Sequence, residues 1–329
     1  MRLSLYVLTA MLIFSGCKKT SANGEDGDTS WPSQPPLPTL TGEASFSLAA
    51  SEDHINVMET FMPRMPAFPK AKRKELIMNG YVADLAGKPV RGAFIGLRSP
   101  GTVYIAASAT TDANGYYQMN IPLGGADLYA AGYTIDYGTG GRAALSLYPS
   151  DGSKILENPS QGVVKNFVVL SYGLADANER ATRPWSAAGY FGGSLRFDYS
   201  IYDNMWNPRG LPAGEEVELK LTPMPGTTMY NENKTFTVYK KIGSGNGNFL
   251  INNIPIGKYT IVAKLKDGRQ LKMIHSGPYA SQYPHQGLQP AEAIGSASVL
   301  FTPVAVEAGS PPPNYGYWRP VAITLQLPI

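Results

Sequence analysis

Cysteine is nearly absent from this sequence, since Cys17 is the only one among 329 residues. A single cysteine cannot form a disulfide within its own chain, so the fold has to be held by packing and hydrogen bonding. Cys17 directly follows the apolar run near the N-terminus and two small residues. This position indicates that the cysteine serves a purpose other than folding.

Catalytic and metal-binding motifs are also missing. The sequence has no His-Glu-x-x-His, paired Cys-x-x-Cys, Walker loop or Gly-x-Ser-x-Gly, and it has only three histidines. His275 and His285 share one long loop, but without a clear third ligand such a pair is more typical of ordinary loop residues. We therefore expect no catalytic residue, no metal and no cofactor. The net charge of +3 is too small to indicate a nucleic acid partner.

Long apolar runs are confined to the N-terminus. A basic start at Arg2 is followed by the run Leu5–Phe14, which is too short to span a bilayer as a mature helix. The small residues Ser15 and Gly16 then precede Cys17. This order of basic, apolar and small residues predicts a signal peptide over residues 1–16.

The segment Phe14-Ser15-Gly16-Cys17 resembles the lipobox of bacterial lipoproteins, with Phe14 in place of the usual leucine. In that family a diacylglycerol is joined to the cysteine sulfur, the chain is cut before the cysteine, and the new amine is usually acylated. The resemblance implies that Cys17 anchors the protein to a membrane, whereas the alternative is a plain secretory signal.

The residues after Cys17 bear on where such an anchor is held. No aspartate follows Cys17, so the inner-membrane retention signal of some lipoproteins is absent. We therefore expect an envelope protein of the outer membrane, on either its periplasmic or its surface face. Lys18 and Lys19, with acidic residues further on, only weakly resemble the surface-export signals of Bacteroidota lipoproteins.

Residues 17–75 are predicted to form a lipidated tether and linker. Residues 18–41 are rich in Ser, Gly, Pro, Asp and Glu, which leaves little apolar surface to bury and favours disorder. The apolar positions of residues 44–58 show no clean period. The basic run Lys70–Lys74 can suggest an anionic partner, but a short run just before a strand is usually solvated linker.

From Leu76 onward the pattern is that of β structure. Apolar runs are short, Gly and Pro are frequent at 35 and 27 residues, and helical periodicity is missing. We expect an all-β protein of tandem Greek-key sandwiches. In the first block, the strands are predicted at 77–83, 90–97, 103–111, 116–121, 128–135, 143–148 and 164–170. The turn at Asp112–Gly115 is predicted to close a hairpin of the Asn-Gly type.

Residues 76–171 resemble the carboxypeptidase regulatory-like domain. That family folds as a seven-stranded, transthyretin-like sandwich and recurs as a non-catalytic module in carboxypeptidases, outer-membrane receptors and surface lipoproteins, so the resemblance implies a fold and no chemistry. The residues that carry it are Gly80-Tyr81-Val82, Asp84, Gly87-Lys88-Pro89-Val90, Gly92-Ala93, Thr111–Tyr117 and Ile121–Gly124.

A second copy of the sandwich is predicted over residues 188–329, after a linker at 172–187. The stretch Asn114–Gly124 aligns with Asn246–Gly257 when one inserted residue is allowed, and an extra residue in a strand is what a β-bulge requires. Strands are expected at 194–201, 217–222, 235–240, 258–263, 298–304 and 321–327. The second block has no counterpart of Gly87–Val90.

Two aromatic loops are the candidate binding sites. The segment 274–297 is predicted to be a long insertion between strands, and the segment 311–318 is rich in proline and aromatic residues. Exposed rings there would suit stacking on sugars or packing on a protein partner, while the alternative is that they cover sandwich ends or fill the space between domains. The candidate ligand-binding residues are Tyr279, Tyr283, Tyr315, Tyr317 and Trp318.

Three functions remain open from the sequence. The favoured one is a non-enzymatic envelope lipoprotein that acts as a binding or structural module. Its lipid would bind the membrane, and its loops would bind an envelope protein or a glycan. The second is a carbohydrate-binding accessory lipoprotein that uses the aromatic loops. The third is a hydrolase with an unrecognised site, which would need a cleft with converging carboxylates or histidines.

Overall fold

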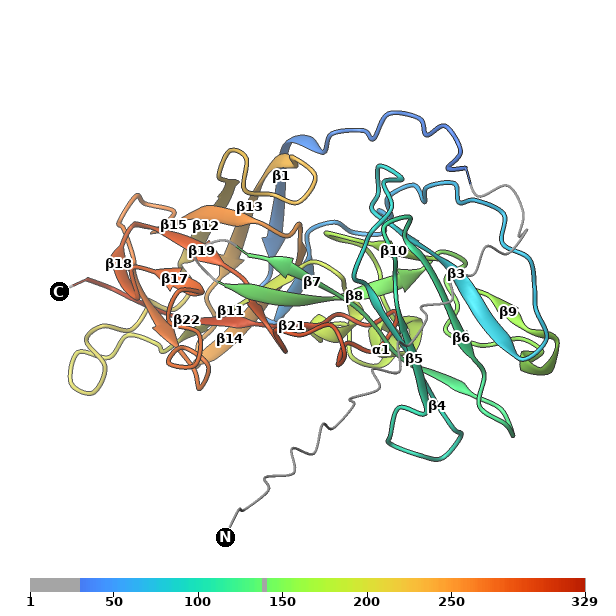
Figure 1. Cartoon of the computed structure of the whole chain (residues 1–329). Helices are drawn as coiled ribbons and strands as arrows, with labels where there is room; N and C mark the ends of the chain where they lie inside the picture. The colour runs from blue at the N-terminus through green and yellow to red at the C-terminus, as the bar shows by residue number, and fades with distance from the viewer. Residues whose placement is uncertain (1–29, 138–140, 329) are drawn as a thin grey trace, which may run out of the picture.

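The computed structural model describes residues 30–137 and 141–328, so the predicted signal peptide and Cys17 lie outside the described residues. The chain forms two β-sandwiches side by side, with one short α-helix, which confirms the predicted all-β class (Figure 1). The alternating burial expected of half-buried strands is plain in β12 (Glu216–Pro223), where Val217, Leu219 and Leu221 are buried and their neighbours are not.

The first sandwich is one hydrogen-bonded sheet in the order β5-β4-β7-β8-β10-β3-β6, with β9 added beside β3. Its edge strands β5 and β6 lie next to each other, so the sheet curls round on itself. The strands are β3 (Ile77–Ala83), β4 (Phe94–Arg98), β5 (Ala107–Thr110), β6 (Tyr116–Asn120), β7 (Asp127–Asp136), β8 (Arg142–Pro149), β9 (Val163–Val164) and β10 (Phe167–Val169).

The second sandwich has two six-stranded sheets, β1-β13-β12-β15-β19-β17 and β18-β16-β22-β11-β14-β2, and a small pair β20-β21. Besides β12, its strands are β1 (Thr41–Leu48), β2 (His54–Asn56), β11 (Gly193–Tyr199), β13 (Asn233–Lys241), β14 (Gly247–Ile254), β15 (Lys258–Leu265), β16 (Lys272–Ser276), β17 (Gly287–Gln289), β18 (Glu292–Ile294), β19 (Ser296–Leu300), β20 (Thr302–Pro303), β21 (Trp318–Arg319) and β22 (Val321–Gln326). The segment 274–297, predicted as a long loop, therefore contains the end of β16 and all of β17 and β18.

Seven strands of the first sandwich correspond to seven of the second, and all but one of their pairings are the same. In the first, β3 pairs with β6 antiparallel and with β10 parallel; in the second, β11 pairs with β14 antiparallel and with β22 parallel. Likewise β4 lies between β5 and β7, as β12 lies between β13 and β15. The two differ in that β7 pairs with β8, whereas no ladder joins β15 to β16 among the described strands.

The predicted one-residue insertion in the second copy is a β-bulge. The ladder between β11 and β14 shifts register between Gly193 and Leu195, which face Ile254 and Ile251, so β14 carries the extra residue. The equivalent ladder between β3 and β6 is regular. Asn253 lies within the bulge at a φ of 64°, a left-handed conformation that asparagine tolerates better than most residues. The prediction of a bulge is confirmed.

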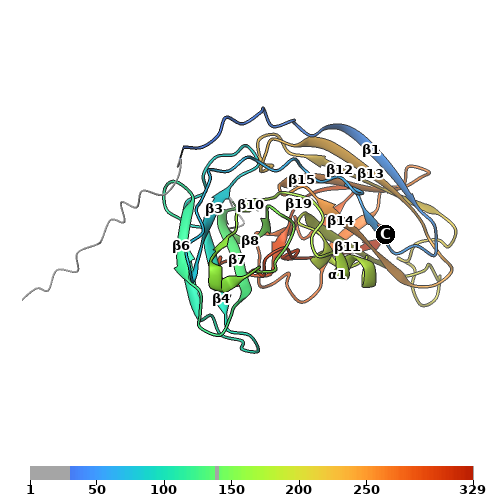
Figure 2. The same ribbon diagram turned by 90° about the vertical axis from the view of Figure 1, so that its right-hand side faces the viewer.

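The prediction that residues 17–75 are a tether is wrong for the part that the structure describes. Strand β1 (Thr41–Leu48) pairs in parallel with β13, and β2 (His54–Asn56) pairs in parallel with β14. The N-terminal segment arches over both sandwiches before it enters the first (Figure 2). The first sandwich is thus an insertion within the second, and the predicted boundary at residue 188 leaves out two edge strands.

The segment 172–187 is also ordered, in contrast to the predicted linker. It holds α1 (Ala177–Thr182), whose N-cap is the Asp176 carboxylate, and its C-terminal end leads into the 3-10 turn η3 (Ala187–Gly189). Asp176 Oδ1 accepts hydrogen bonds from the backbone N–H groups of Asn178 and Glu179. A further 3-10 turn, η2 (Pro159–Gln161), precedes β9.

The predicted hairpin at Asp112–Gly115 is not a hairpin. Strand β5 pairs with β4 and β6 pairs with β3, so the turn connects the two edges of the curled sheet. Only Gly115 of this turn has a positive φ, of 71°, whereas an Asn-Gly hairpin has the type I′ geometry, which needs two such residues. A Cβ at Gly115 would lie 2.5 Å from the Val82 carbonyl oxygen, so glycine is required for the close approach to β3.

The apolar core is continuous through both sandwiches. The buried residues of the first sandwich, such as Ile95 and Phe167, belong to the same cluster as Phe249 and Ile323 of the second. A smaller cluster around Leu170 packs against Leu37, Met62, Met65 and Phe68 of the N-terminal segment. The two sandwiches and this segment therefore form one body rather than modules on a flexible linker.

Candidate functional site

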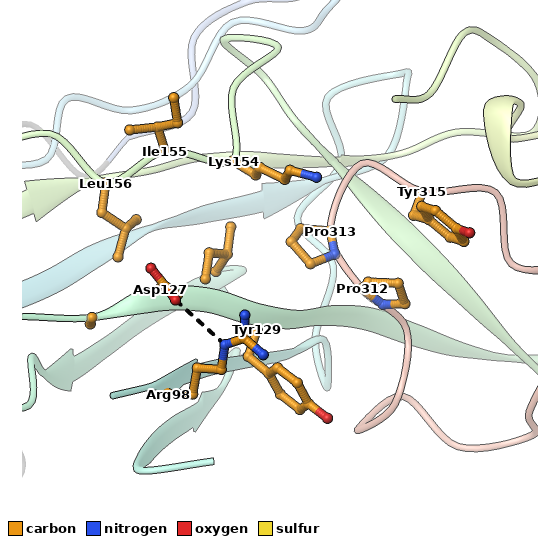
Figure 3. Close-up of a pocket in the computed structure, with 11 residues that line it drawn as sticks. Arg98, Asp127, Tyr129, Lys154, Ile155, Leu156, Pro312, Pro313 and Tyr315 are labelled. Atoms are coloured by element: carbon orange, nitrogen blue, oxygen red, sulfur yellow. Dashed lines mark ion pairs between the residues drawn. The ribbon is translucent and has the colours of Figure 1, made fainter. Parts of the chain in front are cut away.

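The candidate site is a groove at the junction of the two sandwiches, with a volume of about 480 Å³ (Figure 3). This volume falls in the range of small-molecule sites. Three segments that are far apart in the sequence form its walls: the start of β7 with the end of β4, the loop at 154–156 and the segment before β21. The lining residues are Arg98, Ala126, Asp127, Leu128, Tyr129, Lys154, Ile155, Leu156, Pro312, Pro313 and Tyr315.

The segment before β21 crosses from the second sandwich and is bonded to the first. The Ala131 N–H donates to the Pro311 carbonyl at 2.9 Å, and the Asn314 N–H donates to the Leu147 carbonyl at 3.0 Å. Glycine at position 132 allows this approach, because a Cβ there would lie 2.4 Å from the Ala308 carbonyl oxygen. One wall of the groove is therefore fixed by backbone hydrogen bonds to β7 and β8.

The buried Lys165 side chain holds the loop that carries Lys154 by contacts with Asp151 and Ile155. Lys165 is 4% exposed, and its Nζ lies 2.7 Å from Asp151 Oδ2 and 3.1 Å from the Ile155 carbonyl oxygen. Lys154 Nζ in turn lies 2.8 Å from Asp176 Oδ2. A buried ammonium that donates to both ends of a loop fixes its shape, because the charge would otherwise be left without partners.

The charges at the groove are balanced in pairs. Figure 3 shows the ion pair of Arg98 with Asp127 as a dashed line, and the Tyr129 ring beside the guanidinium. The Arg98 Nε lies 3.5 Å from Asp127 Oδ2, and the guanidinium carbon lies 5.2 Å from the centre of the Tyr129 ring. The hydrogen bond from Lys154 and those from the α1 backbone lower the pKa of Asp176. Burial raises the pKa of Tyr315. The groove thus offers flat rings, prolines and a few hydrogen-bonding groups.

A second cleft of about 410 Å³ adjoins the groove. The two clefts share Lys154 and Ile155, so the loop at 154–156 forms a wall between them. The second cleft is lined on its other side by Tyr148, Asp176 and Arg180.

The three aromatic residues near the C-terminus that are predicted to bind a ligand lie in different environments. Tyr315 lines the groove, and Tyr317 lies beside it, partly buried. Trp318 is only 4% exposed, its Nε1 donates to the Phe191 carbonyl at 3.0 Å, and its ring packs against Tyr137. The prediction that Trp318 is a ligand-binding ring is wrong, because the ring fills the space between the two sandwiches.

Tyr279 and Tyr283 do not reach the groove. The Arg319 guanidinium lies 3.8 Å from the centre of the Tyr279 ring, and Tyr279 lines a separate cleft of about 280 Å³. His275 lines that cleft from β16, and burial lowers its pKa, while His285 is exposed on the loop beyond. The structure thus places Tyr315 in the groove, Tyr279 in a separate cleft and Trp318 in the interior, so the five predicted residues do not form one site.

Sequence reasoning missed Arg98, Tyr129 and Lys154 as groove residues. Arg98 ends β4, Tyr129 lies in β7, and Lys154 follows β8. No motif connects these positions, because strand pairing brings them together. The sequence indicates the groove only indirectly. The proline run at 311–313 beside Tyr315 indicates a rigid segment that packs against another part of the protein.

The clefts hold no paired carboxylates. Asp127, Asp176 and Glu292 are the single acidic residues of three clefts, and each is in an ion pair, with Arg98, Lys154 and Lys272. Within residues 30–137 and 141–328, no three His, Cys, Asp or Glu side chains are grouped to hold a metal ion. None of the helices in that same part of the chain has the length and apolar character to cross a membrane.

Comparison with known proteins adds little. No family model and no curated protein matches the chain. Two crystal structures of the shaft pilin SpaA from Lactobacillus rhamnosus GG, a double mutant and a single mutant, are similar to it at 13% and 12% identity. The alignments cover 78% and 79% of this chain and 98% of the pilin, at a TM-score of 0.17. A likeness at this TM-score carries no argument about the chain.

Proposed function

We propose that the protein is a non-enzymatic lipoprotein of the cell envelope, anchored in the outer membrane through Cys17, that binds a partner in the groove between its sandwiches. The groove carries this proposal. Its walls come from both sandwiches, and Gly132 and Lys165 hold them in place. A rigid scaffold with a preformed concave surface is what a binding module needs, because little ordering is left to do when the partner arrives.

The chemistry of the groove favours binding over catalysis. Hydrolysis by paired carboxylates requires two such groups at one reacting centre. The groove has one, Asp127, and the guanidinium of Arg98 already lies beside it. The rings of Tyr129 and Tyr315 and the two prolines offer flat apolar contact instead.

A glycan is the second candidate partner, because the groove has the parts that bind sugars. An aromatic ring can stack on a sugar face, and a guanidinium can donate to hydroxyl oxygens. Tyr129 and Arg98 place both groups within one site, with 5.2 Å between the guanidinium carbon and the ring centre. An envelope protein would use the same surface through its own exposed aromatic or proline residues.

The test compares groove variants with a matched surface variant. The protein, immobilised, is exposed to a glycan array and to detergent-solubilised outer-membrane proteins. Tyr129→Ala and Tyr315→Ala should lose the captured glycan or protein, while Tyr202→Ala, which removes an exposed ring 47% accessible on the second sandwich, should keep it. Circular dichroism confirms that each variant is folded. Capture of a partner that is equal in all folded variants would contradict the groove as the binding surface, and no capture at all would contradict the binding function.

A further inference from the structure

One end of the first sandwich gathers exposed apolar side chains, of which only Ile155 also lines the groove. Among the described residues, 14 large apolar side chains are exposed, and six of them lie at this end. The four most exposed of these six are Leu123 at 87%, Tyr104 at 79%, Ile155 at 69% and Val103 at 67%, and the other two are Ile105 and Leu76. Such a concentration marks an interaction surface rather than scattered exposure.

Strand pairing places these residues together. Arg98 at the end of β4 faces Asp127 at the start of β7, so the loops 99–106 and 121–126 leave the sheet at the same end. A Cβ at Gly125 would lie 3.8 Å from Pro100, which shows that the two loops touch. β8 is antiparallel to β7, so the loop after β8 that carries Ile155 also lies at this end. In Figure 1 the loop after β4 projects below the first sandwich.

Two of the three loops that carry the most exposed residues are uncharged, while the loop that carries Ile155 also contains Asp151, Lys154 and Glu157. Neither 99–106 nor 121–126 contains an acidic or basic residue. A loop of this kind can enter the headgroup region of a bilayer without the cost of moving a charge out of water. We name the exposed side chains of Leu76, Val103, Tyr104, Ile105, Leu123 and Ile155 the apolar end.

The basic run Lys70–Lys74 leads to the same place. The Asn79 side chain donates to the Lys72 carbonyl at 2.9 Å, and the Leu76 N–H donates to the Ser160 carbonyl at 3.4 Å. The run therefore lies beside the start of β3, at the apolar end, and Lys70, Lys72 and Arg73 are exposed. Basic residues beside exposed apolar loops match an anionic lipid surface in both charge and polarity.

The chain between Cys17 and the body is long enough for this arrangement. Trp31 Nε1 donates to the Asn114 carbonyl at 3.2 Å, so the described chain starts at the opposite end of the first sandwich. The length of β3, which separates the two ends, is about 23 Å at 3.3 Å per residue. Ser30 follows Cys17 by 13 residues, which reach at most about 45 Å.

From these observations we propose that the apolar end rests on a bilayer containing anionic lipid, the membrane that holds the proposed Cys17 anchor. The inference rests on the proposed anchoring, so its test attaches the chain to vesicles in another way. A chain from Lys18 onward contains every described residue and no cysteine, and an N-terminal oligohistidine tag holds it on vesicles with nickel-chelating lipid. A single Tyr104→Cys substitution then carries an environment-sensitive NBD label, with Trp206→Cys as control, because Trp206 is 83% exposed on the second sandwich.

The expected result is that the label at position 104 shifts its emission to the blue and is quenched by nitroxides on the acyl chains, while the label at 206 does neither. The effect should be larger on vesicles of phosphatidylcholine with phosphatidylglycerol than on phosphatidylcholine alone. In the untagged chain, Arg73→Ser should lower association with the anionic vesicles about five-fold. Equal behaviour of the two labels, or burial of position 104 only when envelope proteins are added, would overturn the proposal. Absence of fatty acid on Cys17 would instead overturn the anchoring alone.

Discussion

Single buried polar residues hold the parts of this molecule together. Lys240 on β13 is 1% exposed, and its Nζ donates to the carbonyl oxygens of Ala49 and Ala50 at 2.6 and 3.1 Å and of Glu52 at 2.5 Å. Burial lowers the pKa of Lys240, with Glu52 and Asp53 opposing that shift. An ammonium surrounded by three carbonyls compensates for its lost hydration, and it fixes the turn that joins β1 to β2.

Removing this ammonium should loosen the N-terminal strands. In Lys240→Met three carbonyl groups lose a charged donor, so the free energy of unfolding should fall by about 2–4 kcal/mol. Hydrogen exchange should speed up in β1 and β2 before it does elsewhere. Lys266→Met, at an exposed ion pair with Glu216, is the control and should leave the free energy of unfolding almost unchanged, because solvent screens an exposed pair. Unchanged exchange in β1 would show that Lys240 does not hold this segment.

The Asp176 carboxylate should give the stability of the α1 region an acid dependence. The hydrogen bond from Lys154 is the main cause that lowers the pKa of Asp176 from its ordinary range. A group with a lowered pKa stabilises the fold above its unfolded-state value, and that contribution is lost as the pH falls through the folded value. Asp176→Asn keeps a capping oxygen but loses the charge. The variant should lose about 0.5–1 kcal/mol at about pH 7, and its difference from the parent should be smaller at about pH 2. Urea midpoints at both pH values measure this, and a constant difference would contradict it.

At the scale of elements, the sequence predicts the strands correctly where apolar runs and turn residues mark them clearly. The seven predicted strands of the first block all occur, and the insertion in the second copy is the bulge of β14. Strand β1 was missed because only Ala44, Phe46 and Leu48 alternate inward between polar neighbours, and its partner β13 lies far along the chain. The groove was missed for a similar reason, since pairing of distant strands brings Arg98, Tyr129 and Tyr315 together.

The bulge in β14 should be needed for the junction of the two sandwiches. Asn253 Oδ1 accepts from the Gly173 N–H at 2.8 Å and the Gly192 N–H at 3.3 Å, and Asn253 Nδ2 donates to Asn56 Oδ1 at 3.0 Å. Asn253→Gly keeps the left-handed backbone but loses these bonds, and should cost about 1–3 kcal/mol of unfolding free energy. Asn253→Ala should cost about 1 kcal/mol more, because alanine also disfavours a positive φ. Equal losses in the two variants, measured by urea unfolding, would show that the backbone conformation contributes nothing.

At the scale of the whole molecule, the sequence predicts two sandwiches, but the structure joins them into one body. The core is continuous, Trp318 and the segment before it fill the junction, and the N-terminal strands belong to the second sandwich. This integration could not be seen from the sequence, because each local pattern is complete within one block. Because the two sandwiches form one body, the groove and the apolar end have fixed positions relative to each other. If the apolar end contacts a membrane, this contact determines the direction in which the groove faces.

Lipid attachment at Cys17 is central to the proposed function, and metabolic labelling tests it most directly. Cells that produce the full chain, or its Cys17→Ser variant, are fed an alkyne-bearing fatty acid, and the purified protein is coupled to a fluorophore. We expect a labelled chain in the outer-membrane fraction for the parent and none for Cys17→Ser. A parent chain without label, or a Cys17→Ser chain that retains it, would contradict lipid attachment at Cys17.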